Sequence, residues 1–111
     1  MKLAIIGTRT LVIENLEKHI PKEVTEIVSG GARGVDRQAA DFAKTHGIKL
    51  TEFLPDYARF GKGAPLKRNV QIAEYADAVL AFWDGKSKGT LFTIELFQKL
   101  NKKVEVKIVE N

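Results

Sequence analysis

Glycine, hydroxyl and arginine residues gather at positions 29–36, between an apolar run at 24–28 and an amphipathic stretch at 37–44. Glycines between a strand and a helix let the backbone turn sharply and bring its N–H groups close to an anion at the helix N-terminus. Arg33, inside the turn, adds a planar charged donor suited to phosphate or carboxylate. The segment indicates a phosphate- or nucleotide-binding loop, although a glycine turn without a ligand has the same pattern.

Two further loops have a similar composition. Residues 7–10 follow the apolar run at 3–6, and residues 84–90 follow the apolar run at 78–83. If the runs are parallel strands, all three loops leave the carboxyl ends of strands, where α/β sheets bind their ligands. Their convergence at one edge favours a phosphate site more strongly than one glycine loop does.

The segments between these loops alternate between predicted strand and predicted helix. Apolar runs predict strands at 3–6, 24–28, 48–54, 78–83 and 104–109, and helical periodicity predicts helices at 11–20, 37–44, 65–76 and 91–100. The strand at 48–54 is expected near a sheet edge, and the one at 78–83 near the centre. Residues 55–63 form the longest predicted loop. The alternation predicts an α/β fold, a parallel sheet with helices on both faces.

Composition narrows the class of protein. The chain has 111 residues, 44% of them hydrophobic, which fits a single domain at 1–111. It has no cysteine, so disulfides and thiolate metal sites are excluded, and no apolar run approaches a membrane span. We therefore expect a cytoplasmic protein. The formal charge of +4 comes from scattered lysines, which are typical of a solvated surface.

Several common sites are not indicated. The glycines are spaced G-G-x-x-G after the second strand, whereas a dinucleotide fingerprint has G-x-G-x-x-G after the first, and there is no Walker A motif. His19 and His46 are far apart and lack neighbouring carboxylates, so no metal site is expected. His46 beside Gly47 is expected to contact the carbonyl groups at a helix end. No cofactor is predicted.

The motifs resemble those of a known superfamily. Residues 29–36 look like the S-G-x-A-R-G-[IV]-D loop of the DNA processing protein A (Smf) family, and Arg68-Asn69 looks like its R-N pair. The order of G-G-x-x-G, arginine and Gly-Thr is similar to that of the LOG phosphoribohydrolases. The whole pattern, through the F-W-D-G segment at 82–85, most resembles the small YspA-type (YpsA-related) family of the SLOG superfamily. That resemblance implies a Rossmann-like sheet of about five strands that binds nucleotides.

The resemblance also implies roles for individual residues. A phosphate would be held by the glycine loop (Ser29, Gly30, Gly31, Arg33 and Gly34) and by the loop after the first strand (Gly7, Thr8 and Arg9). Asp36 would meet a ribose hydroxyl or cap a helix, and Arg68 and Asn69 would reach phosphate or sugar. Gly89 and Thr90 would add donors, and Asp84 and Gly85 would stand at the rim. Glu95 and Arg68 are the catalytic candidates implied by the phosphoribohydrolases, but Glu95 lies about one helical turn later than their pattern requires.

Two functions of different classes follow. One is a ligand-binding or sensor domain for a nucleotide or nucleotide derivative, and the other is an N-glycosidase that releases base from a nucleoside monophosphate. Single-stranded DNA binding through Tyr57, Arg59, Phe60 and Lys62 is a less favoured third hypothesis.

Apolar residues on more than one face of the helix at 91–100 predict a homodimer or higher homo-oligomer.

Overall fold

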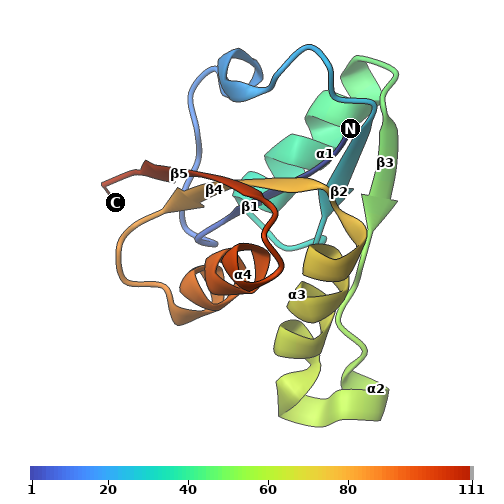
Figure 1. The fold of residues 1–111 in the computed structure, drawn as a ribbon, viewed down its shortest axis with the longest axis vertical. Coiled ribbons are helices and arrows are strands. Elements are labelled where there is room, and N and C mark those ends of the chain that lie inside the picture. The colour runs from blue at the N-terminus through green and yellow to red at the C-terminus, as the bar shows by residue number, and fades with distance from the viewer. Residues whose placement is uncertain (111) are drawn as a thin grey trace.

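The computed structural model describes residues 1–110, which form a five-stranded parallel sheet with helices on both faces (Figure 1). The strands are β1 (Lys2–Gly7), β2 (Glu26–Ser29), β3 (Lys49–Glu52), β4 (Ala78–Trp83) and β5 (Lys103–Ile108). Their order across the sheet is β3-β2-β1-β4-β5, and each neighbouring pair is parallel. The predicted Rossmann-like α/β fold is confirmed, with β3 at one edge and β4 between two neighbours.

Helices cover the two faces unequally. They are α1 (Val35–Thr45), α2 (Tyr57–Phe60), α3 (Ala64–Tyr75) and α4 (Lys88–Lys99), with short 3-10 helices η1 (Leu16–His19) and η2 (Gly61–Gly63). Successive residues of β1 point to opposite faces, so Leu3 and Ile5 pack with α1, while Ala4 and Ile6 pack with α3 and α4. The strand side chains therefore divide the core into two layers.

The segment at 11–20 departs from its predicted structure. The expectation of a helix here is wrong, because residues 11–13 have no helical turn and only η1 is helical. Gln38 on α1 accepts a hydrogen bond from Ile13 N and donates one to Ile13 O, both at 2.8 Å. Leu11 and Ile13 are both buried, as alternate residues of an extended segment can be. A side chain of α1 thus takes the backbone bonds that a helix would have used.

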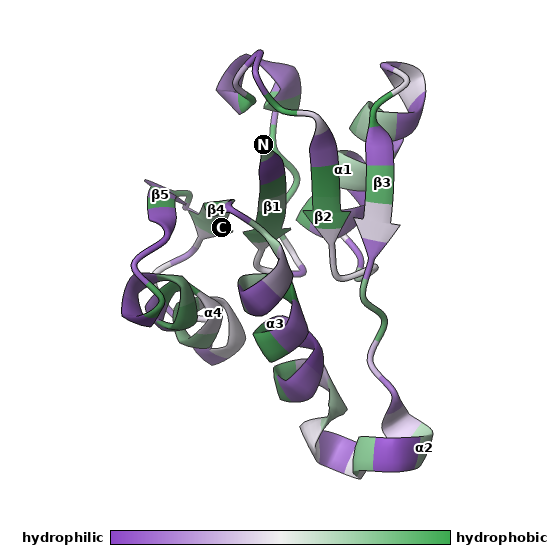
Figure 2. Cartoon of the chain, turned by 45° about the vertical axis from the view of Figure 1, so that its right-hand side comes forward, coloured by the Kyte–Doolittle hydropathy of each residue, from purple (hydrophilic) through white to green (hydrophobic). Residues whose placement is uncertain are grey.

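The expected loop at 55–63 contains α2 and η2. This short helical arm lies beyond the carboxyl end of β3, away from the sheet (Figure 1). Figure 2 shows hydrophilic and hydrophobic residues mixed along α2, whereas β1 is predominantly hydrophobic. Tyr57 and Phe60 are both exposed. The arm therefore presents aromatic side chains near the edge of the sheet where the loops gather.

On α3 the apolar spacing predicts a face lined by Leu66, Val70, Ala73 and Ala76, with Pro65 in the first turn, and the structure agrees with this only in part. Pro65 does occupy the first turn, and Ala73 is buried. Leu66, however, is exposed, and Arg68 is buried with 7% of its surface accessible. The correction has a physical reason, because Arg68 faces polar groups of the loop after β2 that satisfy its guanidinium.

The apolar residues of α4 are only partly covered. Ile94 and Phe97 are buried against the sheet, while Leu91 and Leu100 remain exposed. Association with another copy through this helix stays a prediction. Among residues 1–110, no helix combines the length and the apolar character needed to cross a membrane.

Candidate functional site

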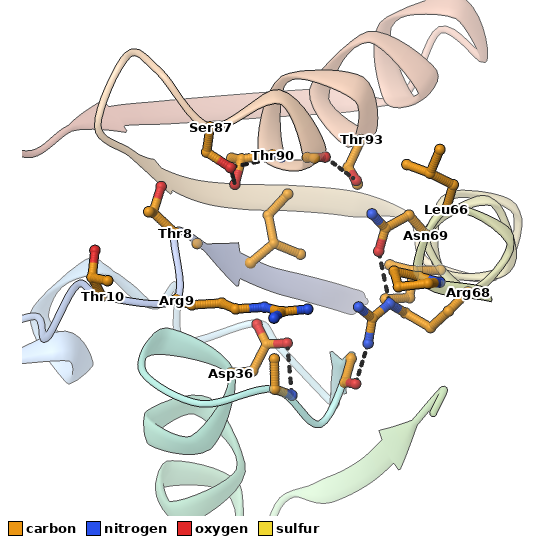
Figure 3. A pocket seen from close by; sticks show the side chains of 17 residues that line it. Thr8, Arg9, Thr10, Asp36, Leu66, Arg68, Asn69, Ser87, Thr90 and Thr93 are labelled. Atoms are coloured by element: carbon orange, nitrogen blue, oxygen red, sulfur yellow. Dashed lines mark hydrogen bonds between the residues drawn. The ribbon is translucent and has the colours of Figure 1, made fainter. Parts of the chain in front are cut away.

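A cavity of about 360 Å³ lies at the carboxyl ends of β1 and β4. These two neighbouring strands mark the place where the order of strands reverses, the usual ligand position in open α/β sheets. We call it the first cavity (Figure 3). It is lined by Ile6, Gly7, Thr8, Arg9, Thr10, Gly30, Ala32, Asp36, Pro65, Leu66, Arg68, Asn69, Ile72, Ser87, Gly89, Thr90 and Thr93.

One wall of the first cavity is cationic. Arg9, from the loop after β1, extends across the cavity toward Arg68, with Asp36 beside it (Figure 3). Arg68 donates from Nη1 to the Gly30 carbonyl and from Nε to Asn69 Oδ1 at 2.8 Å, which fixes its guanidinium. Among residues 1–110, Asp36 is the only carboxylate lining this cavity, so two positive charges face one negative charge. The wall favours an anion.

Burial acts on the charged groups of this wall in opposite directions. It raises the pKa of Asp36, although the Ala32 N–H group and the Arg68 guanidinium oppose that rise. It lowers the pKa of Arg68, and the Asp36 carboxylate partly restores it. Each group stabilises the charge of the other in a poorly solvated position.

The glycine loop is held together by its own side chains. Asp36 Oδ2 accepts a hydrogen bond from Ala32 N at 3.1 Å, so its carboxylate already occupies part of the loop's donor surface. Ser29 Oγ accepts from Gly31 N at 3.3 Å and donates to the Asp36 carbonyl at 3.2 Å. The loop therefore shapes the wall, while the arginine side chains supply most of its attraction for an anion.

Two glycines of this loop are required by close approach. A Cβ on Gly30 would lie 2.5 Å from Arg68 Nη1 and 3.0 Å from Asp36 Oδ2. A Cβ on Gly34, whose φ is +73°, would lie 2.6 Å from the carbonyl oxygen of Arg9. The missing side chains allow the loops after β1 and β2 to meet α3 around the cavity.

The opposite wall is made of hydroxyl groups. Ser87 caps α4, accepting from Thr90 N at 3.4 Å, and its hydroxyl donates to Thr90 Oγ1 at 3.2 Å. Thr93 lies one turn further along α4 and donates to the Gly89 carbonyl at 3.0 Å. Thr8 Oγ1 is buried, and no group within residues 1–110 is positioned to form a hydrogen bond with it. This wall offers neutral polar groups suited to sugar hydroxyls.

The structure brings most of the predicted site residues together. Those lining the first cavity are Gly7, Thr8, Arg9, Gly30, Asp36, Arg68, Asn69, Gly89 and Thr90. Those that do not line it are Ser29, Gly31, Arg33, Gly34, Asp84, Gly85 and Glu95. Ser29 is completely buried beneath the loop. Gly34 allows the backbone at Arg9 to pack closely against the glycine loop.

Two predicted carboxylates stand outside the first cavity. Glu95 is exposed on α4. Asp84 Oδ1 accepts hydrogen bonds from Ser87 N and Lys86 N, both at 2.8 Å. These two bonds lower the pKa of Asp84, and a weak interaction with the nearby Thr8 hydroxyl adds to them. Asp84 orders the turn that leads into α4.

A second cavity of about 240 Å³ adjoins the first. It shares Arg9, Gly30, Ala32 and Arg68 with the first cavity and is completed by Gly31, Arg33, Pro55 and Tyr57. Arg33 and Gly31 thus lie on the far side of the arginine pair. Ser87 and Thr93 of the first cavity were not among the predicted site residues, and Tyr57 was predicted only as part of a cluster for single-stranded DNA. The three-residue spacing of Thr90 and Thr93, which puts them on one helix face, was the available signal.

The fold and the first cavity define a Rossmann-like α/β domain with a cavity, lined by two arginines and one aspartate, at the switch point of its sheet. Within residues 1–110, no three carboxylate or histidine side chains gather in a way that could hold a metal ion. Comparison with family models places residues 5–60 in the YspA, cpYpsA-related SLOG family, and the chain belongs to that family. The match includes the loops after β1 and β2, and α3 and α4 lie beyond it. No curated protein and no solved structure matched the chain.

Proposed function

We propose that this protein binds a nucleotide or nucleotide derivative in the first cavity, with the phosphate between Arg9 and Arg68. Membership of the SLOG family suggests a nucleotide-related ligand. Guanidinium groups make bidentate, charge-assisted hydrogen bonds to phosphate oxygens, and two of them from different elements can grip one phosphate from two sides.

The observation that carries the proposal is the net positive charge of the cavity wall formed by Arg9, Arg68 and Asp36. Arg68 is buried and hydrogen-bonded to Gly30 and Asn69, so its side chain loses little conformational entropy when a ligand binds. Asp36 offsets only one of the two arginine charges. The volume of about 360 Å³ lies within the range of small-molecule sites. The hydroxyl groups of Thr90 and Ser87 supply donors and acceptors for a ribose.

The proposal is tested by titrating the purified protein with AMP, GMP, CMP and UMP. Calorimetry measures the heat of binding, and thermal unfolding measures the melting temperature of the protein. A ligand that binds only the folded state raises the melting temperature as its concentration increases. We expect at least one nucleotide to do so, and inorganic phosphate to do so more weakly. The shift should fall with added salt, because the contact is between charges.

Arg9→Gln provides the decisive variant, because this side chain is exposed and lies on a loop. It should lose most of the nucleotide affinity. Lys67→Gln, which removes an exposed charge next to the cavity residue Arg68, is the matched control and should bind normally. Nucleotide binding that is unchanged in Arg9→Gln would refute this placement of the phosphate. Absence of binding by all four monophosphates, and by the diphosphates and dinucleotides described below, would refute the proposal as a whole.

Hydrolysis of the glycosidic bond is a second candidate, favoured by the presence of Asp36 in the first cavity. Breaking an N-glycosidic bond benefits from a carboxylate near the developing oxocarbenium centre. If the protein releases free base from a nucleoside monophosphate, Asp36→Asn should abolish the release and Glu95→Gln should leave it unchanged. The reverse pattern would restore Glu95 to the catalytic role implied by the phosphoribohydrolases.

A further inference from the structure

The second cavity continues the proposed site instead of standing apart from it. Four residues (Arg9, Gly30, Ala32 and Arg68) line both cavities. The two spaces therefore meet at the arginine pair. A ligand that passes from one to the other must cross these two guanidinium groups.

The residues that complete the second cavity can receive an organic group. Tyr57 is 56% exposed and comes from the α2 arm, so its ring is accessible to a flat partner. It also lies close enough to Arg68 for the two groups to interact electrostatically. Pro55 adds an apolar surface, and Arg33 adds a further cation. An aromatic ring beside guanidinium groups is a common setting for a base next to its phosphate.

The distribution of charge indicates where a ligand's anionic group would lie. Arg9 and Arg68 are at the junction of the cavities, and Arg33 stands on the side of the second. Against these three cations, Asp36 is the only carboxylate lining either cavity within residues 1–110. The far wall of the first cavity is neutral, made of Thr90 and other hydroxyl residues. Two of the three positive charges thus lie at the junction, with a neutral polar wall at one end and with Pro55, Tyr57 and Arg33 at the other.

We infer that the natural ligand carries its negative charge in the middle, as two organic groups joined by a pyrophosphate. This inference rests on the proposed function. The pyrophosphate would lie over Arg9 and Arg68, the nucleoside in the first cavity, and the second group against Tyr57. A nucleoside monophosphate would fill the first cavity and leave the second to water.

The test compares three ligands of matched base by calorimetry, namely the nucleoside 5′-monophosphate, the 5′-diphosphate and the dinucleotide with a 5′–5′ pyrophosphate bridge. Adenine, guanine, cytosine and uracil series are run in parallel. In the series that binds, the dinucleotide should bind at least about tenfold more tightly than the monophosphate, because it adds a stacked group and a second phosphate. The diphosphate should fall between them.

Tyr57→Ala should remove about tenfold of the dinucleotide affinity and leave the monophosphate affinity unchanged. Tyr57→Phe should keep the wild-type preference, because the ring remains. Phe60→Ala is the matched control, since Phe60 is an exposed aromatic residue of the same short helix but lines neither cavity. It should retain the preference for the dinucleotide.

The outcomes separate this inference from the proposed function. Equal affinity for monophosphate and dinucleotide would overturn the inference while leaving nucleotide binding intact. The same holds if Tyr57→Ala weakens both ligands equally, or if Phe60→Ala acts like Tyr57→Ala. Failure of every ligand in every series would overturn the proposed function, and this inference with it.

Discussion

Arg68 on α3 donates a hydrogen bond to the carbonyl oxygen of Gly30, 38 positions earlier in the chain. The contact joins the helical wall of the first cavity to its loop wall. It is possible because Gly30 has no side chain, since a Cβ there would lie 2.5 Å from the donating nitrogen. One contact therefore links the geometry of the loop, the burial of the arginine and the charge of the cavity.

Replacing Arg68 by Ala should reduce both stability and nucleotide binding. The Gly30 carbonyl loses its charged donor, so the free energy of unfolding should fall by about 1–3 kcal/mol in urea denaturation. Nucleotide affinity should fall at least about tenfold, as expected for a lost charge-assisted bond to phosphate. Lys67→Ala, one position earlier and exposed, controls for the change of net charge. Normal nucleotide affinity in Arg68→Ala would contradict this role.

Asp36→Asn should strengthen anion binding. The amide oxygen of Asn can still accept from Ala32 N, while the negative charge beside Arg9 and Arg68 is removed. Burial raises the pKa of Asp36. As the pH falls, this carboxylate therefore becomes protonated, and neutral, at a higher pH than an exposed aspartate does. The affinity advantage of Asp36→Asn over wild type should therefore shrink as the pH is lowered. An advantage that is independent of pH, measured by calorimetry between neutral pH and about pH 4, would contradict this account.

The protein should lose stability in acid, because protonation of Glu26 removes the stabilisation that its ionised carboxylate provides. The Tyr75 hydroxyl donates a hydrogen bond to Glu26 Oε2, and Thr51 Oγ1 donates one to the same oxygen at 2.7 Å. These bonds lower the pKa of Glu26 despite its burial. The unfolded chain then binds more protons than the folded one near the ordinary glutamate pKa, so the stabilisation is present above that pKa and lost as pH falls through the lower folded value.

The matched variant for this effect is Glu26→Gln, which has no charge to titrate. Its loss of unfolding free energy relative to wild type, measured by urea denaturation, should be largest near neutral pH. That loss should decrease as the pH approaches the folded pKa of Glu26. A difference that grows on acidification would have the wrong sign and would refute the assignment.

Gln38→Ala should loosen the segment at 11–20. Both backbone groups of Ile13 lose their partner, and two hydrogen bonds at 2.8 Å disappear. The expected cost is about 1–3 kcal/mol of unfolding free energy, with faster hydrogen exchange at the Ile13 amide. Gln38→Glu keeps an acceptor for the Ile13 amide but lacks the donor, so it should slow this exchange relative to Gln38→Ala. Equal exchange in all three proteins would show that the side chain does not hold the segment.

Lys102→Met should destabilise the end of α3. The Lys102 ammonium donates to the carbonyl oxygens of Ala73, Glu74 and Ala76 at 2.7–2.9 Å, which are acceptors at the negative end of the helix dipole. Methionine has a similar length but no donor, and the expected loss is about 1–3 kcal/mol of unfolding free energy. Lys103→Met removes an exposed lysine of β5 and should have little effect. Equal losses in the two variants would argue against a specific cap.

Local patterns predicted most elements of the fold because strands and helices here bury regular sets of apolar residues. Residues 78–83 form β4 with the same bounds as predicted, and His46 does contact the helix end, with its Nδ1 at 3.0 Å from the Phe42 carbonyl. The predicted helix at 11–20 failed for a long-range reason. Its apolar spacing is compatible with a helix, but Gln38 supplies hydrogen bonds to an extended backbone.

The amino-acid sequence alone determined the alternation of strands and helices, the three loops at one edge of the sheet, and the family. These properties depend on neighbours in the chain, on apolar periodicity and on short motifs. It took the folded chain to place Arg68 at the cavity and Glu95 at the exposed side of α4, and to bond the Asp36 carboxylate to the Ala32 N–H of the glycine loop. The tertiary structure also brought Tyr57 beside the arginine pair. Those outcomes depend on the order of strands and on which helix face meets the sheet, and both are set by contacts between residues far apart in the chain.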